Sequence, residues 1–122
     1  MTPVRLLIVD DVPQVRKDLR TLLVLAGGIE VVGEAADGRE AVELALRLRP
    51  DVVVMDLEMP VLSGYEATRQ VKALYPGCRV VALTVHGGEA FRQQARQAGI
   101  DEFVVKGAAL ETLVNAISKG AN

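Results

Sequence analysis

The sequence predicts an α/β protein in which five parallel strands alternate with five helices. Five short apolar runs alternate with segments of helical periodicity, and the connections between them are short. Continuous apolar runs are typical of strands buried on both faces of a parallel sheet. The second run is more polar, with Glu30 and Glu34, as expected of a strand at the sheet edge. These features favour a flavodoxin-like (βα)5 three-layer sandwich with strand order 2-1-3-4-5.

The chain is expected to begin with a strand, a helix and a second strand, in that order. A strand over Arg5–Asp10 leads into a helix over Pro13–Ala26, which ends at Gly27 because glycine tolerates the left-handed conformation that closes helices. A second strand covers Ile29–Ala35. Helical spacing predicts an apolar face on the helix over Pro13–Ala26, made of Val15, Leu19, Leu22, Leu23 and Ala26. Three basic residues are expected on its solvated side: Arg16, Lys17 and Arg20.

Capping patterns indicate where the second and third helices begin. Asp37 and Glu40 form one capping box, and Ser63 and Glu66 form another. Between these two helices, the apolar run Val52–Asp56 is expected to form the third strand. The second helix is expected to bury Ala41, Leu44, Ala45 and Leu48, and the third helix should end near residue 74.

The last part of the chain is expected to hold two strands and two helices. The strands are predicted over Arg79–Thr84 and Glu102–Lys106, with a helix from about Glu89 to Gly99 between them. This helix should face the core with Phe91, Ala95 and Ala98. The final helix should do so with Leu110, Leu113, Val114 and Ile117.

Composition predicts one ordinary globular domain over residues 1–122. Half of the 122 residues are apolar, which is enough for a core without disulfides. The formal net charge of −2 gives no basic footprint for nucleic acid. A single cysteine, Cys78, indicates a reducing compartment, and we expect its thiol to be inert. Because no signal peptide or membrane-spanning stretch is apparent, we expect a cytoplasmic protein that does not engage a membrane.

Charged and hydroxyl side chains follow the apolar runs where each run ends. Asp10 and Asp11 follow the first run, Asp56 the third, Thr84 the fourth and Lys106 the fifth. The carboxyl ends of parallel strands share one sheet edge, so these side chains should meet there. Gathered carboxylates repel each other unless a cation joins them, and oxygen ligands favour Mg²⁺. Because an aspartate can accept a phosphoryl group as an acyl phosphate, the cluster suits Mg²⁺-dependent phosphoryl transfer.

From about Arg5 to Lys119, the chain resembles the receiver domain of bacterial two-component response regulators. The resemblance is carried by Asp10-Asp11, Asp56-Leu57-Glu58-Met59-Pro60, Gly64, Thr84 and Lys106, in this order and at these strand ends. Two further segments resemble the NarL/LuxR-type subgroup, namely 32–38 (VGEAADG) and 105–108 (VKGA).

The resemblance implies how a metal and a phosphoryl group would be held. Asp56 would be the phosphoacceptor, modified to 4-aspartylphosphate. Asp11, Asp56 and the backbone carbonyl of Glu58 would ligate Mg²⁺ directly, and Asp10 would act on the ion mostly through water. Lys106 would bind phosphoryl oxygens.

The resemblance also implies a switch. Thr84 would donate its hydroxyl to the phosphoryl group, and Phe103, three residues before Lys106, would turn inward as Thr84 moves. A static core aromatic remains an alternative interpretation of Phe103. The chain would then act as a signalling module, and would be an enzyme only toward its own aspartyl phosphorylation and dephosphorylation.

The implied partners are a sensor histidine kinase and a second copy of the chain, which would bind through the first and last helices or through the last helix and strand. Regulators of the resembling subgroup usually carry a C-terminal helix-turn-helix domain. DNA would therefore be contacted only by a domain outside this chain, which we expect to be the receiver part of a longer transcription regulator.

Two positions depart from the usual pattern of the family, and a third, His86, lies next to one of them. Gly107 stands where proline usually follows the lysine, and Val85 stands where a smaller residue often follows the threonine. The bulk of Val85 is expected to slow exchange at the phosphoryl group. His86, two residues after Thr84, is expected to be a solvated loop histidine.

Three other functions compete with this interpretation. A pseudo-receiver, a binding module that works without phosphorylation, usually lacks one of the five motif residues, and all five are present here. A phosphatase of the haloacid dehalogenase type would want an aspartate where Glu58 stands. A flavin-binding protein would want aromatic residues to flank the ring, and this chain has no tryptophan and two tyrosines.

Overall fold

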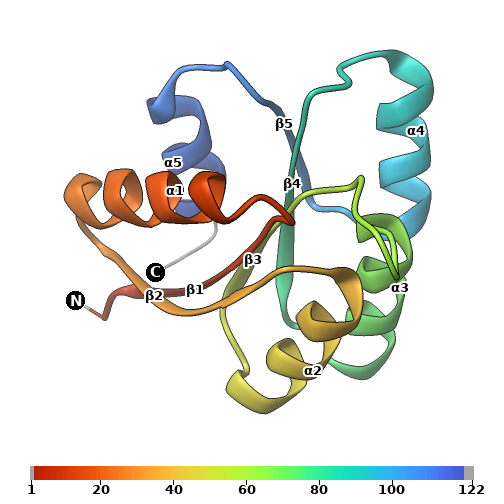
Figure 1. The fold of residues 1–122 in the computed structure, drawn as a ribbon, viewed down its shortest axis with the longest axis horizontal. Helices are drawn as coiled ribbons and strands as arrows, with labels where there is room; N and C mark the ends of the chain where they lie inside the picture. The colour runs from red at the N-terminus through yellow and green to blue at the C-terminus, as the bar shows by residue number, and fades with distance from the viewer. Residues whose placement is uncertain (1, 120–122) are drawn as a thin grey trace.

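The computed structural model describes residues 2–119, and over this range five parallel strands alternate with five helices in three layers (Figure 1). The strand order is β2-β1-β3-β4-β5, as predicted. The strands are β1 (Val4–Val9), β2 (Ile29–Ala35), β3 (Val52–Met55), β4 (Arg79–Thr84) and β5 (Glu102–Val105). The helices are α1 (Pro13–Ala26), α2 (Gly38–Leu48), α3 (Gly64–Leu74), α4 (Glu89–Ala98) and α5 (Leu110–Ser118).

The sheet separates two apolar cores. Alternate residues of a strand point to opposite faces, so Leu7 and Val9 of β1 join one core while Leu6 and Ile8 join the other. Helices α1 and α5 cover one face, and α2, α3 and α4 cover the other (Figure 1). Because both faces are covered, the central strands are apolar throughout, which is why they appear as unbroken runs in the sequence.

The register of the strands aligns their carboxyl ends. Val9, the last residue of β1, lies opposite Ala35 of β2 and Met55 of β3, and Met55 lies opposite Ala82 of β4. The residues that follow β1 and β3 therefore leave the sheet side by side. One irregularity interrupts β2, where Val32 is an extra residue between the pairs Leu6–Val31 and Leu7–Gly33.

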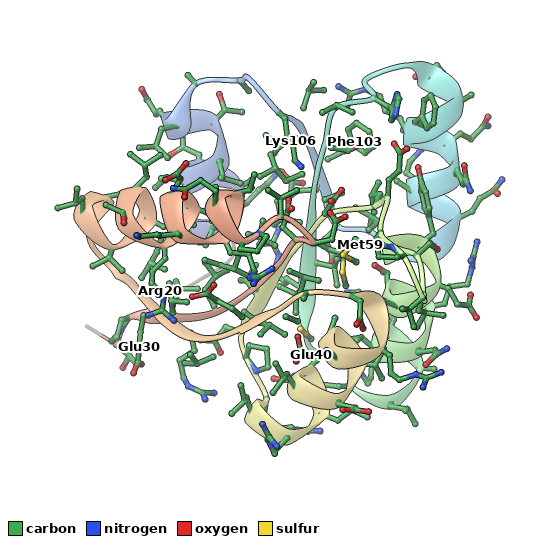
Figure 2. The ribbon with its side chains drawn as sticks, viewed as in Figure 1. Arg20, Glu30, Glu40, Met59, Phe103 and Lys106 are labelled. Atoms are coloured by element: carbon green, nitrogen blue, oxygen red, sulfur yellow. The ribbon has the colours of Figure 1, made fainter. Side chains whose placement is uncertain are left out.

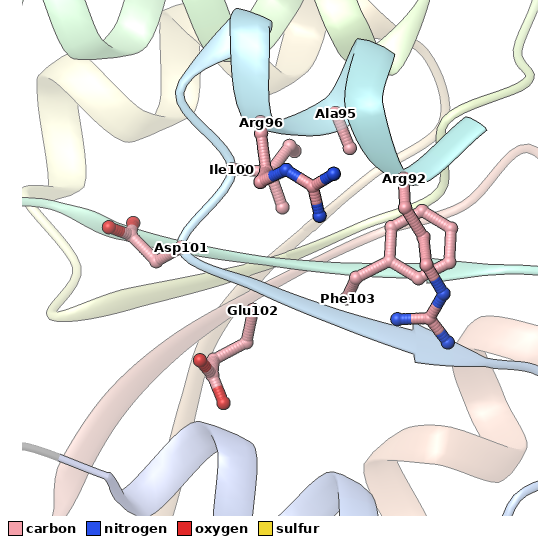
Figure 3. A pocket seen from close by; sticks show the side chains of 7 residues that line it. All are labelled: Arg92, Ala95, Arg96, Ile100, Asp101, Glu102 and Phe103. Atoms are coloured by element: carbon pink, nitrogen blue, oxygen red, sulfur yellow. The ribbon is translucent and has the colours of Figure 1, made fainter. Parts of the chain in front are cut away.

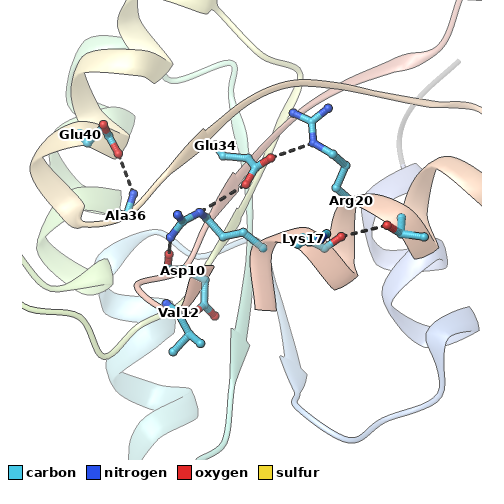
Figure 4. Close-up of polar contacts among 9 residues, drawn as sticks. Asp10, Val12, Lys17, Arg20, Glu34, Ala36 and Glu40 are labelled. Carbon is cyan, nitrogen blue, oxygen red and sulfur yellow. Dashed lines mark hydrogen bonds and ion pairs between the residues drawn. The ribbon is translucent and has the colours of Figure 1, made fainter. Parts of the chain in front are cut away.

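Of the two predicted capping boxes, the one at α2 is present, whereas only the N-cap half of the one at α3 forms. The Asp37 side chain accepts a hydrogen bond from the Glu40 amide at 2.9 Å, and the Glu40 carboxylate accepts one from the Ala36 amide at 2.7 Å (Figure 4). At α3, the Ser63 hydroxyl accepts from the Glu66 amide at 3.2 Å, but the Glu66 carboxylate pairs with Arg69 instead of turning back.

The expected apolar faces of three helices are partly wrong. In α1 only Leu23 is buried, whereas Leu22 is 45% exposed. Leu110, at the start of α5, is 38% exposed, and Phe91 of α4 is 36% exposed. Because α1 and α5 share one face of the sheet, each covers it with a narrow stripe rather than a broad face. In α4, Phe91 stacks on the His86 ring instead of joining the core.

Two further expectations concern single residues and helix length. Cys78 is fully buried, and burial raises the pKa of its thiol to about 11, so the thiol stays protonated and inert as expected. Among the described residues, none of the helices combines the length and the apolar composition that a membrane span requires.

Gly64 allows α3 to start against the end of β3. A Cβ atom placed there would overlap the carbonyl oxygen of Asp56 and lie 2.7 Å from the Cα of Leu57. The Gly64 amide also donates to the Leu57 carbonyl at 3.0 Å, which closes the loop between β3 and α3. The loop that carries Asp56 therefore depends on a glycine at its far end.

We expect Gly64→Ala to lower the free energy of unfolding by about 1–3 kcal/mol, because backbone must move to admit the methyl group. Urea denaturation followed by circular dichroism would measure the change. Gly77→Ala is the matched control, since a Cβ there would meet only a Tyr75 side-chain atom at 3.7 Å. Equal unfolding midpoints for the two variants would contradict this account of Gly64.

Candidate functional site

Three carboxylates meet at the carboxyl edge of the sheet. One side-chain oxygen from each of Asp10, Asp11 and Asp56 lies within 4.8 Å of the others. Asp10 and Asp56 are buried, and Asp11 is exposed. Asp10 and Asp11 follow β1, Asp56 follows β3, and these two strands are neighbours in the sheet. The structure thus brings together the three acidic residues that the sequence placed at this edge.

Asp10 is held on both sides of its side chain. One carboxylate oxygen accepts a hydrogen bond from the Val12 amide at 2.9 Å, and the other faces the Lys106 ammonium at 3.0 Å. The Asp10 amide donates to the Ala35 carbonyl at 3.1 Å, which extends the pairing of β1 and β2. A buried charge needs such partners, and Lys106 supplies the opposite charge.

Asp56 keeps one oxygen toward its own loop and the other toward Lys106. Its amide donates to the Val9 carbonyl at 3.0 Å, which places the residue beside the end of β1. Its Oδ1 accepts from the Glu58 amide at 3.2 Å, and its Oδ2 lies 3.8 Å from the Lys106 ammonium. Asp56 is therefore held less tightly by the lysine than Asp10 is.

The environment of Asp56 disfavours its charged form. Burial raises the pKa of Asp56 from 3.8 to about 6, and the neighbouring carboxylates of Asp10 and Asp11 act in the same direction. The Glu58 amide and the Lys106 ammonium oppose this rise without cancelling it. Three carboxylates meet here and one ammonium faces them, so the ionised cluster carries unneutralised negative charge, and a small hard cation with oxygen ligands fits the donor set.

Thr84 and Lys106 border the cluster from neighbouring strands. Thr84 ends β4 and is buried, and its hydroxyl accepts from the His86 amide at 3.3 Å. The Lys106 amide donates to the Thr84 carbonyl at 2.7 Å, so the two residues leave the sheet together. Figure 2 shows Lys106 at the end of β5, near the place where the loops after β1 and β3 gather.

His86 lies in the loop after β4 with its side chain 40% exposed, as expected, but it makes two contacts that the sequence did not predict. Its Nε2 lies 2.6 Å from the Glu58 carboxylate, and its ring stacks on Phe91 with the ring centroids 4.6 Å apart. Glu58 and His86 belong to the loops after β3 and β4, so their pair joins these loops across the rim of the site. Val85, beside His86, is mostly exposed, and its predicted effect on phosphoryl exchange stays a prediction.

Phe103 is a residue of β5, and its ring faces Arg92 of α4. Its ring packs at the margin of one core, with the Arg92 guanidinium 4.7 Å from the ring centroid. A cavity of about 310 Å³ adjoins it, lined by residues of α4 and β5 (Figure 3). The structure records one position of this ring, so its predicted role as a switch stays a prediction.

Two loops of the site contain residues with positive φ. Gly107 has a φ of 98°, which a proline ring could not adopt, so the loop after Lys106 follows a path closed to the residue usually found in the family. Val61, between β3 and α3, has a φ of 72°. This conformation is strained for a β-branched residue, and strain of this kind gathers at functional sites.

Arg16 is a residue of the site that the sequence analysis missed. We expected its side chain on the solvated side of α1, but its guanidinium donates to the Asp10 carbonyl at 2.7 Å. Nothing in the spacing of α1 separates Arg16 from the adjacent Lys17, because the contact depends on how α1 is oriented over the end of β1.

The sequence matches the response regulator receiver domain family over residues 6–118. It is 41% identical over 114 residues to the response regulator GacA of Pseudomonas viridiflava, covering 93% of this chain and 53% of the relative. The chain thus spans about half the length of this relative.

Two solved structures show the same fold. One is a two-component response regulator of the LuxR family from Aurantimonas sp. SI85-9A1, with a TM-score of 0.91, 40% identity, and coverage of 96% of this chain and 84% of that one. The other is CheY in a complex with CheX, BeF3 and Mg²⁺ from Borrelia burgdorferi, with a TM-score of 0.88, 26% identity, and coverage of 96% and 88%.

The pKa of Asp56 predicts how stability depends on pH. The folded protein keeps a proton on Asp56 up to about pH 6, whereas the unfolded chain loses it near pH 3.8. The unfolded state therefore binds fewer protons in this window, and the free energy of unfolding should fall as pH rises from about 4 to 6. We expect Asp56→Asn to remove this fall and to stabilise the metal-free protein at pH 7.5 by about 1–2 kcal/mol, after allowance for residual hydration.

Urea denaturation in EDTA at pH 4.5 and 7.5 would measure both effects. Glu43→Gln, which neutralises an exposed carboxylate of α2, is the control and should leave the pH dependence unchanged. The prediction is wrong if the Asp56→Asn protein shows the same pH dependence as the native one.

Proposed function

Because this chain belongs to the response regulator receiver domain family, we propose that Asp56 accepts a phosphoryl group from a histidine kinase in a two-component signalling system. The observation that carries the proposal is the convergence of three carboxylates with Lys106, whose ammonium lies 3.8 Å from Asp56 and 3.0 Å from Asp10. Receiver domains of response regulators are not enzymes in the usual sense. We infer that this one acts only on its own phosphorylation.

In the proposed reaction, the Asp56 carboxylate is the nucleophile. One of its oxygens forms a bond to phosphorus while the bond between phosphorus and the donor nitrogen breaks, and the donor imidazole leaves with the electron pair. The Glu58 amide holds Oδ1 at 3.2 Å, which leaves Oδ2 on the side of Lys106. With a pKa of about 6, Asp56 is mostly ionised near neutral pH and can attack. In hydrolysis, water attacks phosphorus, the bond between phosphorus and the Asp56 oxygen breaks, and the carboxylate leaves with the electron pair as inorganic phosphate is released.

We propose that Asp11, Asp56 and the backbone carbonyl of Glu58 hold Mg²⁺, and that Asp10 contacts it through water. The oxygen donors and the unneutralised charge around Asp56 suit this ion. When bound, Mg²⁺ supplies charge neutralisation for the transferring phosphoryl group. The family relative CheY from Borrelia burgdorferi, solved with BeF3 and Mg²⁺, supports the assignment by similarity.

Lys106 and Thr84 would recognise the phosphoryl oxygens and start the switch. The Lys106 ammonium lies close enough to Asp56 to reach an oxygen of its phosphoryl group. The Thr84 hydroxyl, which accepts from His86, keeps its own proton free to donate. A hydrogen bond to a charged group contributes roughly 1.5–3 kcal/mol, whereas a nearly complete switch needs about 5.5 kcal/mol. Thr84 and Lys106 would therefore act together with repacking of Phe103.

We further propose that residues 1–122 form one receiver domain of a longer, cytoplasmic transcription regulator. The partial coverage of GacA and the similarity to a LuxR-family regulator support this proposal. DNA would be bound by a helix-turn-helix domain outside this chain, and a homodimer would be one way to transmit the switch.

We expect the chain to gain one phosphoryl group when it is incubated with Mg²⁺ and acetyl phosphate, as measured by intact mass. Asp56→Asn, or EDTA with the native chain, should abolish the gain, because the nucleophile or the charge-neutralising ion is then missing. Glu43→Gln should behave as the native chain. A native chain that gains no phosphoryl group would favour a pseudo-receiver, and rapid continuous release of phosphate would favour a phosphatase.

We expect Thr84→Ala to be phosphorylated but to switch poorly. Phosphorylation should change the amide chemical shifts of Phe103 and Arg92 less than half as much as it does in the native chain. The reason is that a hydrogen bond of roughly 1.5–3 kcal/mol is lost. Thr21→Ala, on the exposed side of α1, is the control. Native-sized shifts in a phosphorylated Thr84→Ala protein would contradict this role of Thr84.

A further inference from the structure

We propose that Arg16 is a positioning residue that fixes the main chain of Asp10 and thereby orients both aspartates after β1. The inference rests on the proposed function, in which Asp10 and Asp11 face the cation. It adds a residue outside the five motif positions, and it concerns how the acidic cluster is held rather than which residues touch the phosphoryl group.

Arg16 contacts two separate segments, the residue that follows β1 and the strand β2. Its Nη1 donates to the Asp10 carbonyl at 2.7 Å, and its Nε lies 3.3 Å from Oε1 of Glu34 on β2. The other oxygen of Glu34 pairs with Arg20 at 2.7 Å (Figure 4). The Arg16 side chain is only 17% exposed, whereas Arg20 is 46% exposed. Arg16 is therefore a shielded cation held between the end of β1 and the edge strand.

The contact with Asp10 completes the hydrogen bonding of a residue that has left the strand ladder. The Asp10 amide is used by Ala35, but β1 ends at Val9, so the Asp10 carbonyl needs a partner outside the sheet. Arg16 supplies it. The Asp10 amide holds the peptide before this residue, and the Asp10 carbonyl holds the peptide after it, so the peptide between Asp10 and Asp11 cannot rotate freely. This peptide sets where the Asp11 side chain starts, and its orientation also keeps the Asp10 carboxylate on Val12 and Lys106.

An arginine suits this position for two reasons. Its planar fork can donate to a carbonyl and a carboxylate at once, which the single ammonium of lysine does less well. A bare positive charge beside a cation site would repel the cation, but Glu34 neutralises the Arg16 guanidinium. Arg16 can therefore hold the backbone of Asp10 in place without weakening the binding of a cation. Arg20 shares Glu34 but has no recorded contact with Asp10, which makes it a matched control.

The first measurement is the Mg²⁺ affinity of the whole chain by isothermal titration calorimetry. We expect Kd to rise about tenfold in Arg16→Gln, since loss of residues that orient metal ligands weakens binding by roughly 10–100-fold. Arg20→Gln should stay within about twofold of the native chain, because its ion pair is exposed. Arg16→Lys keeps the charge and should still bind weakly. If Arg16→Lys binds as the native chain and Arg16→Gln binds more tightly, charge alone matters and the proposal is overturned.

The second measurement uses the metal-free protein, so it separates this inference from the proposed function. We expect amide hydrogen exchange at Val12 to speed up about tenfold in both Arg16 variants and to stay unchanged in Arg20→Gln, because the turn loosens locally. Circular dichroism would confirm that the variants are folded. A native chain that binds no Mg²⁺ would refute the proposed function, while unchanged exchange at Val12 in both Arg16 variants would refute the role of Arg16.

Discussion

Repulsion among three carboxylates is the constraint on which the rest of this structure depends. Asp10 and Asp56 are buried beside each other because β1 and β3 pair in parallel and end at the same level. Left alone, such a pair would push the strand ends apart or take up protons. Lys106 compensates part of the charge, while burial, with a smaller contribution from Asp10 and Asp11, raises the pKa of Asp56. A bound cation, or a change in charge at Asp56, would therefore relieve the repulsion among the carboxylates.

The two cores hold this unfavourable cluster in place. The last residues of β1 and β3, Val9 and Met55, are buried, and the acidic residues follow them directly in the chain. The sheet therefore fixes where each functional side chain starts, while the loops decide where it points. Contacts between loops, such as Glu58 with His86, refine the positions without taking part in the core. This division lets the site carry electrostatic strain that the surrounding fold can tolerate.

Much of the fold could be predicted because burial on both faces leaves a plain sequence signal. The apolar runs identified the central strands, and the polar β2 identified the edge, so the strand order followed. The grouping of Asp10, Asp11 and Asp56 followed from that order. Helical spacing did not show how much of each helix the sheet covers, and Leu22 and Leu110 were misplaced for that reason. The contacts of Arg16 and His86 could not be predicted because their partners lie in distant segments of the chain. The left-handed backbone of Val61 could not be predicted because β-branched residues rarely adopt it.

The irregular pairing of β2 bears on how this domain avoids aggregation. A regular, apolar strand at a sheet edge would offer its free backbone groups to any other exposed strand. Here the extra residue Val32 breaks the repeat of those groups, and Glu30 adds a charge that an incoming strand would have to bury. Edge-to-edge pairing through β2 is thereby discouraged.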